Sequence, residues 1–193
     1  MNYRRIQVSR IHDVEENLAV ASRLQLALEM MLRNGKIDTL TYNIVVRVPR
    51  LQRLETCLLA ATACRYSELQ LIEIERLTEG QAFMIIQPKT KSPRILSGIE
   101  EMATIDWAGV NLSCRYPLTN YDMSRRAISR VVPGELRQAL LNENDKTHIF
   151  RHLRATWMKM LGFDIGEIAN YLGHTNIDST RQYIHKSLQV LLK

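Results

Sequence analysis

The spacing of apolar positions predicts a chain built mainly of helices. Over residues 14–34, apolar residues recur at steps of three and four, with Asp13 as a candidate N-cap and Gly35 as the stop. A second helix is expected over residues 51–64, where one broad apolar stripe follows Pro49. Proline suits the first turn of a helix because its missing N–H is not needed there.

The period changes to that of a β-strand in the middle of the chain. Residues 82–86 form a short apolar run, residues 87–93 have the Pro, Lys and Ser content of a turn, and residues 94–97 can return as a second strand. The pattern therefore predicts a small antiparallel hairpin, or a three-stranded sheet that contains it.

Helical spacing returns in the second half of the chain. The expected helices are 119–131, 134–142, 148–161, 165–172 and one from about 179 onward. Glycine or proline lies at several of their boundaries, and the chain shows no internal repeat and no linker rich in Gly, Pro or Ser. The pattern predicts a compact, mainly α fold with a small sheet.

Composition narrows the class of protein further. The 193 residues are 46% hydrophobic and 24% charged, which excludes disordered and low-complexity classes. The three cysteines form no CxxC, which argues against a secreted disulfide scaffold, and no apolar run approaches the length of a membrane span. We therefore expect a cytoplasmic protein without a membrane partner.

The net charge of +6 is concentrated in two segments. Residues 44–65 hold four basic and one acidic residue, and residues 146–193 hold seven basic and three acidic residues. If the two segments meet in the fold, they form one positive surface suited to nucleic acid. On charge alone, two separate solvated helix faces are an equally good interpretation.

Candidate functional side chains lie in two segments, residues 61–69 and 147–185. In chain order they are Arg65, His148, Arg151, His174 and Tyr183. His148 and Arg151 are three residues apart, so one face of a helix can carry both. His174 follows a glycine that ends a helix, which predicts a position at a loop–helix junction.

At these residues the chain resembles the tyrosine recombinase (phage integrase) family. The motifs of that family read approximately T-G-x-R-x-S-E-L, H-x-L-R-H, and L-G-H followed nine residues later by a tyrosine. They match residues 62–69, 148–152, and 172–174 with Tyr183, and the resemblance covers about residues 50–187. Ala63 stands where the family usually has glycine, and Ile-Phe replaces a polar-Leu pair in the second motif; neither change removes a functional group.

The resemblance implies a site-specific recombinase that cuts and rejoins duplex DNA through a 3′-phosphotyrosyl intermediate, in integration, excision, inversion or resolution. The implied catalytic residues are the nucleophile Tyr183, the phosphate clamp Arg65 and Arg151, the base His148, the phosphate donor His174 and the leaving-group acid Lys89. Lys91, two residues later, is the alternative acid. No ATP is needed, because the phosphotyrosyl link stores the energy of the broken bond. No other cofactor and no metal are expected.

The residue types suit this chemistry. The planar guanidinium of arginine binds two phosphate oxygens at once and keeps its charge, so Arg65 and Arg151 can stabilise the transition state. A tyrosine hydroxyl has a pKa near 10 and needs proton removal in cationic surroundings. We interpret Glu68 as a structural brace for Arg65 and His152 as a brace near the site.

The resemblance also implies partners and a domain division. Double-stranded DNA, a homo-tetramer on two DNA sites and an accessory DNA-bending or directionality protein are expected, at the nucleoid. Most members of the family have a separate clamp domain, but only 64 residues precede Arg65. We therefore expect a short, catalytic-domain-only type: a helical extension over 1–46 and a tyrosine recombinase catalytic domain over 47–193.

Three alternatives stay open at this point. The chain can be an inactive DNA-binding regulator that keeps the fold, or a type IB-like topoisomerase with a similar set of catalytic groups. His148 and His152, four residues apart, can bind a metal, but no HExxH glutamate or cysteine ligand accompanies them. Each candidate residue also has an ordinary structural interpretation. If the set has no catalytic role, all of these structural interpretations must be true at once, for residues that have this order and spacing by coincidence.

Overall fold

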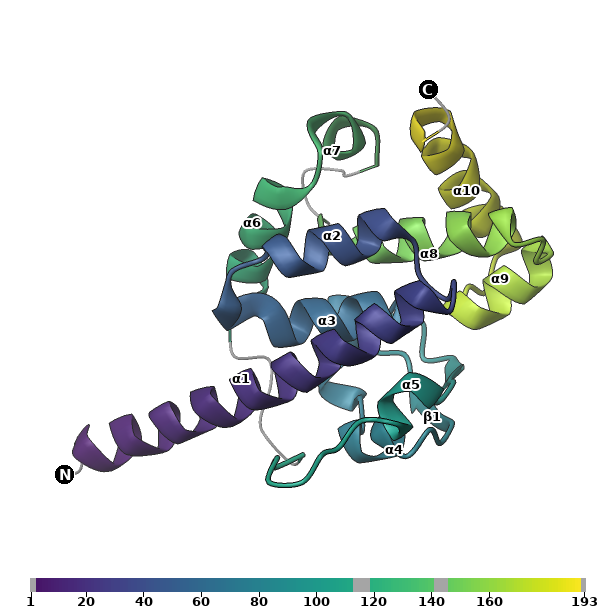
Figure 1. Cartoon of the computed structure of the whole chain (residues 1–193). Helices are drawn as coiled ribbons and strands as arrows, with labels where there is room; N and C mark the ends of the chain where they lie inside the picture. Colours follow the sequence, from purple (N-terminus) through teal and green to yellow (C-terminus); the bar gives the residue numbers. More distant parts are fainter. Residues whose placement is uncertain (1–2, 113–118, 141–145, 192–193) are drawn as a thin grey trace.

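A long N-terminal helix leads into a helical body with one small hairpin (Figure 1). The computed structural model describes the backbone of residues 3–112, 119–140 and 146–191, and the side chains of residues 13–112, 119–138 and 147–185. The α-helices are α1 (Tyr3–Arg33), α2 (Thr39–Arg47), α3 (Arg53–Thr62), α4 (Ile74–Thr78), α5 (Glu100–Ala103), α6 (Tyr121–Val131), α7 (Gly134–Leu140), α8 (Ile149–Met160), α9 (Ile165–Leu172) and α10 (Ile177–Leu191). The 3-10 helices are η1 (Arg50–Gln52), η2 (Tyr66–Leu71) and η3 (Lys146–His148), and the strands are β1 (Phe83–Ile86) and β2 (Pro93–Leu96).

The N-terminal helices differ from the prediction at two points. α1 begins well before Asp13, which lies inside the helix and is not its N-cap, because no glycine or proline interrupts the preceding residues. α2 was not predicted at all; its N-cap is Asp38, whose carboxylate accepts a hydrogen bond from the backbone N–H of Thr41 at 2.8 Å. The predicted stop after α1 is confirmed, since Gly35 has a φ of 69°.

The hairpin and the later helices follow the predicted order. β1 pairs antiparallel with β2 in a register that places Phe83 opposite Leu96, and the described part of the chain contains this two-stranded sheet. Phe83 and Leu96 face inward, whereas Met84 and Ile95 pair on the exposed side. The predicted helix over 134–142 is seen as far as Leu140, and its last two positions lie outside the described residues.

One large core joins the N-terminal helices to the rest of the fold. It contains α1, α2, α3, the hairpin, α6 and α8, and Leu24, Leu28, Leu58 and Phe150 are almost completely buried in it. Burying such a side chain contributes roughly 1.5–3 kcal/mol to folding. The division at residues 46 and 47 stays a prediction.

A smaller apolar cluster lies beneath α9 and α10. It consists of Ala63, Ala155, Ile168, Leu172 and Ile184. α9 is well delimited: Asp164 and Glu167 form a reciprocal capping box at its start, and Gly173 adopts a left-handed conformation at its end. The small cluster therefore positions the segment that leads from Gly173 into α10.

Two of the three cysteines are buried thiols. Burial raises the pKa of Cys57 to about 12, and it also raises the pKa of Cys64. Cys114 lies outside the described residues.

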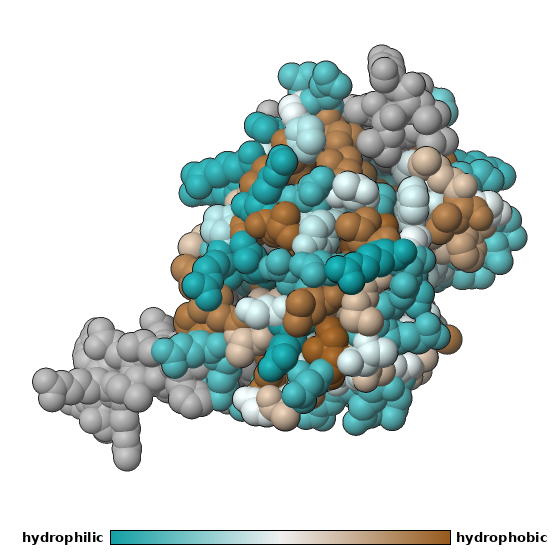
Figure 2. Space-filling model, viewed as in Figure 1, coloured by the Kyte–Doolittle hydropathy of each residue, from teal (hydrophilic) through white to brown (hydrophobic). Residues whose placement is uncertain are grey.

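The outer surface mixes both kinds of side chain. On the face shown in Figure 2, hydrophobic residues lie in several patches separated by hydrophilic ones. Among the helices in the described residues, none is both long enough and apolar enough to cross a membrane.

Candidate active site

A buried carboxylate, Glu68, lies at the centre of the candidate site. Arg65 donates to it twice, from Nη1 to Oε1 at 2.7 Å and from the backbone N–H to Oε2 at 3.0 Å. Nη1 of Arg94 donates to Oε2 at 2.9 Å, and Nη1 of Arg151 lies 3.9 Å from the same oxygen. Burial alone would raise the pKa of Glu68, but Arg94, Arg151 and the bonds from Arg65 hold that pKa below its usual value.

Arg151 is held by the ends of two helices. Its Nη1 donates to the carbonyl of Ala63 at 2.8 Å and its Nη2 to the carbonyl of Leu172 at 2.6 Å. Burial, together with the charges of Arg94 and Arg65, lowers the pKa of Arg151 to about 10, so the side chain is still charged at neutral pH. Its buried Nε has no hydrogen-bond partner among the described residues.

The conformation of Ala63 explains the unusual residue in the first motif. Ala63 has a φ of 53° and a ψ of 30° and ends α3 in the left-handed region. Glycine adopts this region more easily than alanine does, because its conformational free energy there is lower by about 1 kcal/mol. The turn directs the Ala63 carbonyl to Arg151, so the alanine keeps the geometry at a small conformational cost.

The candidate nucleophile lies between two histidine rings. Tyr183, in α10, stacks on His152 with ring centroids 3.9 Å apart and an angle of 11° between the planes. Its ring meets that of His174 edge-on at 5.2 Å and 65°. Nδ1 of His174 lies 2.8 Å from the hydroxyl oxygen of the buried Thr180.

His174 is neutral at physiological pH. Burial is the main reason, and the positive charges of Arg151 and Arg65 add to it, so that the pKa of His174 falls to about 3. His148 is the last residue of η3, immediately before α8, and Arg151 lies in the first turn of that helix.

The two lysine candidates lie apart from this group. Lys89 and Lys91 are exposed in the turn between β1 and β2, and Lys91 has a φ of 55°. Within the described residues, neither lysine side chain makes a hydrogen bond or an ion pair. The structure thus gathers four of the six predicted residues: Arg65, Arg151, His174 and Tyr183. It places His148 directly before the helix that carries Arg151, and it leaves the lysine on the adjoining turn.

Sequence reasoning missed three side chains that hold the site together. Arg94, on the inward face of β2, donates from Nε to the Tyr171 carbonyl at 3.0 Å and from Nη2 to the Thr62 carbonyl at 2.9 Å. Gln87 and Thr180 are the other two, and both are completely buried. The strand alternation was a signal for Arg94, because it places that residue on the same face as the apolar Leu96.

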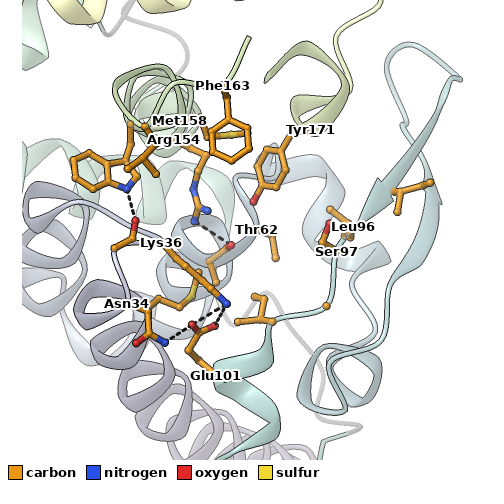
Figure 3. A pocket seen from close by; sticks show the side chains of 18 of the residues that line it. Asn34, Lys36, Thr62, Leu96, Ser97, Glu101, Arg154, Met158, Phe163 and Tyr171 are labelled. Carbon is orange, nitrogen blue, oxygen red and sulfur yellow. Dashed lines mark hydrogen bonds and ion pairs between the residues drawn. The ribbon is translucent and has the colours of Figure 1, made fainter. Parts of the chain in front are cut away.

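Figure 3 shows a separate cavity of about 480 Å³. The aromatic rings of Phe163 and Tyr171 lie at one end, and the ion pair of Lys36 with Glu101 lies at the other, with Nζ and Oε1 3.0 Å apart. Arg94 lines both this cavity and the floor of the site, but none of the six predicted residues lines it. This cavity is therefore distinct from the candidate site.

The histidines do not form a metal centre in the described part of the chain. No group of three or more His, Cys, Asp or Glu side chains is placed there to hold an ion. His152 stacks on Tyr183 instead, as the brace interpretation anticipated.

The chain belongs to the phage integrase family, because the model of the Phage integrase family matches residues 47–189. It is 28% identical to tyrosine recombinase XerD of Staphylococcus saprophyticus over 148 residues, which cover 70% of this chain and 50% of that protein. It is 31% identical to tyrosine recombinase XerC of Pelobacter propionicus over 71 residues, or 37% of this chain and 24% of that protein. The chain thus spans half or less of these curated relatives.

A solved structure supports the fold. The catalytic domain of bacteriophage HP1 integrase superposes with a TM-score of 0.52 at 23% sequence identity, over 80% of this chain and 89% of that domain. The predicted mainly helical fold and the family resemblance are both confirmed.

Proposed function

We propose that this chain is a site-specific DNA recombinase that breaks and rejoins duplex DNA through Tyr183. The phenolic oxygen attacks the scissile phosphorus, the bond from phosphorus to the 5′-oxygen breaks, and a 3′-phosphotyrosyl link forms. A 5′-hydroxyl of the partner strand then attacks this link, releases the tyrosine and rejoins the backbone. One phosphoester replaces another in each step, so the reaction needs no nucleotide cofactor.

The arginines supply the electrostatic part of the catalysis. Arg65 and Arg151 bind the non-bridging oxygens, where negative charge is concentrated in the transition state. The buried Nε of Arg151 supports this role, since a phosphate oxygen would satisfy it. Glu68 keeps the guanidinium groups in place before the DNA arrives.

The remaining groups handle protons. Nδ1 of His174 and the Thr180 hydroxyl share a hydrogen bond. We assign the hydroxyl as its donor, which puts the imidazole proton on Nε2, where a neutral ring can donate to the phosphate. His148 takes the proton of Tyr183, and Lys89, or Lys91 in its place, protonates the leaving 5′-oxygen.

One observation carries the proposal: Tyr183 lies against His174, in a site where Arg65 and Arg151 converge on one carboxylate. These arginines come from the two segments of positive charge, 44–65 and 146–193, so the two segments meet at the site. This arrangement supports double-stranded DNA as the partner. We further propose a homo-tetramer on two DNA sites, with an accessory DNA-bending or directionality protein, at the nucleoid in the cytoplasm.

A nicked suicide duplex tests the proposal. Duplexes that tile the DNA flanking the coding sequence are incubated with the wild type, with Tyr183→Phe and with the control Tyr171→Phe. The products are separated on a denaturing gel. We expect a covalent protein–DNA band with the wild type and with Tyr171→Phe, and none with Tyr183→Phe. A salt-sensitive shift of the duplex without any covalent band would instead indicate a DNA-binding regulator.

A further inference from the structure

The side chain of Gln87 joins three parts of the site that are distant in sequence. Gln87 follows β1, is completely buried and uses both ends of its amide. Oε1 accepts a hydrogen bond from Nη1 of Arg65, and Nε2 donates to the carbonyl of Gly173 at 3.0 Å. Nε2 also lies 3.3 Å from the hydroxyl oxygen of Ser92. These contacts connect the clamp, the residue before His174 and the far side of the lysine turn.

The backbone of Gln87 also closes the lysine turn. Its N–H donates to the Ser92 carbonyl at 3.0 Å, and its carbonyl accepts from the N–H of Lys91 at 2.9 Å. Lys89 is thus held in a closed loop of six residues, from Gln87 to Ser92. The loop is exposed at Lys89 and Lys91, whereas the side-chain amide of Gln87 is buried. Gln87 therefore anchors the base of the loop to the rest of the fold.

Because Gly173 has no side chain, it leaves room for the amide of Gln87 to approach. A Cβ atom on Gly173 would lie 2.6 Å from Nε2 of Gln87 and 2.9 Å from Cδ of Arg94. The glycine that ends α9 therefore allows the hairpin to approach the backbone next to His174. The close approach indicates that this contact is part of the site's construction and not a chance surface contact.

We propose that Gln87 is a positioning residue that seats the lysine-bearing turn against Arg65, so that the leaving-group acid is aligned with the clamped phosphate. This inference rests on the proposed function. Gln87 does not touch the reacting atoms; it acts through the turn that follows it. A long amide suits the task because one end accepts from a guanidinium and the other donates to a carbonyl.

The test compares two leaving groups. In one suicide duplex the scissile 5′-bridging atom is oxygen, and in the other it is sulfur. A thiolate leaves without protonation, so a sulfur substrate does not need the lysine, whichever lysine acts. Gln87→Leu should slow cleavage of the oxygen substrate by about 30-fold, a fraction of what a general acid contributes. On the sulfur substrate, the cleavage rate of Gln87→Leu should return to within about threefold of the wild-type rate, the size of the usual deviation from additivity.

Matched variants make the result specific. Gln81→Leu, the same change at an exposed glutamine before β1, should behave as the wild type on both substrates. Arg65→Lys should be slow on both, because it weakens the clamp and not the acid. Thermal unfolding is measured for each variant, and Gln87→Met, which keeps the length of the side chain, replaces Gln87→Leu if the latter is unfolded.

The outcomes separate this inference from the proposed function. A loss on the oxygen substrate that sulfur restores supports the inference. Equal losses on both substrates, or no loss at all, overturn it while wild-type cleavage still upholds the proposed function. If the wild type cleaves neither substrate, the proposed function itself fails.

Discussion

The two sides of the candidate site are held in different ways. The clamp side, formed by Arg65, Glu68, Arg94 and Arg151, is largely buried and joined by charge-assisted hydrogen bonds over the large core. The nucleophile side, formed by His174 and Tyr183, is half-buried and held by ring contacts, the hydrogen bond between His174 and Thr180, and the small cluster under α10.

The difference matches what each side must do under the proposed mechanism. Electrostatic stabilisation works best when cations are fixed before the charge develops, since no energy is then spent on reorganisation. A nucleophile must approach the phosphorus and afterwards remain attached to a strand end. Ring contacts and a neutral hydrogen bond are weaker than charge-assisted hydrogen bonds, so we expect the nucleophile side to be the one that shifts. The four predictions that follow test this contrast.

The largest effect is expected from Glu68→Gln. This change leaves Arg94 and Arg151 buried without the carboxylate, and breaking a buried ion pair typically costs about 3–5 kcal/mol. We expect the free energy of unfolding, measured with urea, to fall by an amount in that range. The control Glu73→Gln removes an exposed ion pair with Arg76, and it should cost about 0.5 kcal/mol or less. Similar losses in the two variants would contradict the description of the clamp side.

Gly173→Ala should have the next largest effect. Gly173 has a φ of 66°, and the added Cβ would press on Gln87 and Arg94. The control Gly109→Ala has a similar φ of 74° but nothing within 4 Å of its Cβ, so it carries the backbone strain alone. We expect Gly173→Ala to lower the free energy of unfolding by about 1–3 kcal/mol more than the control, the usual cost of overpacking. Equal costs would show that the close approach does not matter.

Thr180→Val tests the hydrogen bond on the nucleophile side. Valine has nearly the same shape, but it cannot bond to Nδ1 of His174. We expect cleavage to slow by about tenfold, which corresponds to about 1.4 kcal/mol, because the imidazole tautomer is no longer fixed. Thr175→Val, at the exposed neighbour of His174, should cleave at the wild-type rate. A fully active Thr180→Val would remove Thr180 from the mechanism.

The fourth prediction is a pH dependence of stability. The folded pKa of His174, about 3, lies below its ordinary value of 6.5, so below pH 6.5 the unfolded chain binds more protons at this residue. Its neutral ring therefore favours folding fully above pH 6.5, and the contribution is lost as the pH falls toward 3. Urea unfolding between pH 7.5 and 5 should show a decline in the wild type that is shallower in His174→Asn. Parallel curves would contradict the burial of a neutral ring.

The sequence predicted the features that depend on local rules. The end of α1 at Gly35 and the end of α9 at Gly173 follow from the left-handed conformation that glycine adopts. The candidate residues could be predicted because the motifs place them at fixed spacings. The start of α1 was misplaced because Asp13 is a plausible N-cap only if the preceding residues are not helical. α2 was missed because its Ile-Val-Val run favours a strand by local propensity, and packing against the core overrides that preference.

The buried polar network could not be predicted in this way. Arg94 and Gln87 lie next to a lysine-rich turn, and polar residues there usually face solvent. Only the approach of β2 to η2 and α9, which are distant in sequence, makes their burial favourable by supplying Glu68 and the carbonyl groups. Long-range partners of this kind leave little trace in one sequence.

The modification rates of the two buried thiols report how often the clamp side opens. Both cysteines belong to the large core, but Sγ of Cys64 also lies 3.4 Å from Nη1 of Arg94. A maleimide or disulfide reagent reaches each sulfur only during the moments when its surroundings separate, because a buried, protonated thiol does not react. If Cys64 is modified faster than Cys57 under native conditions, the arginine cluster opens locally while the rest of the core stays folded. Equal rates mean that the clamp opens only when the whole chain unfolds.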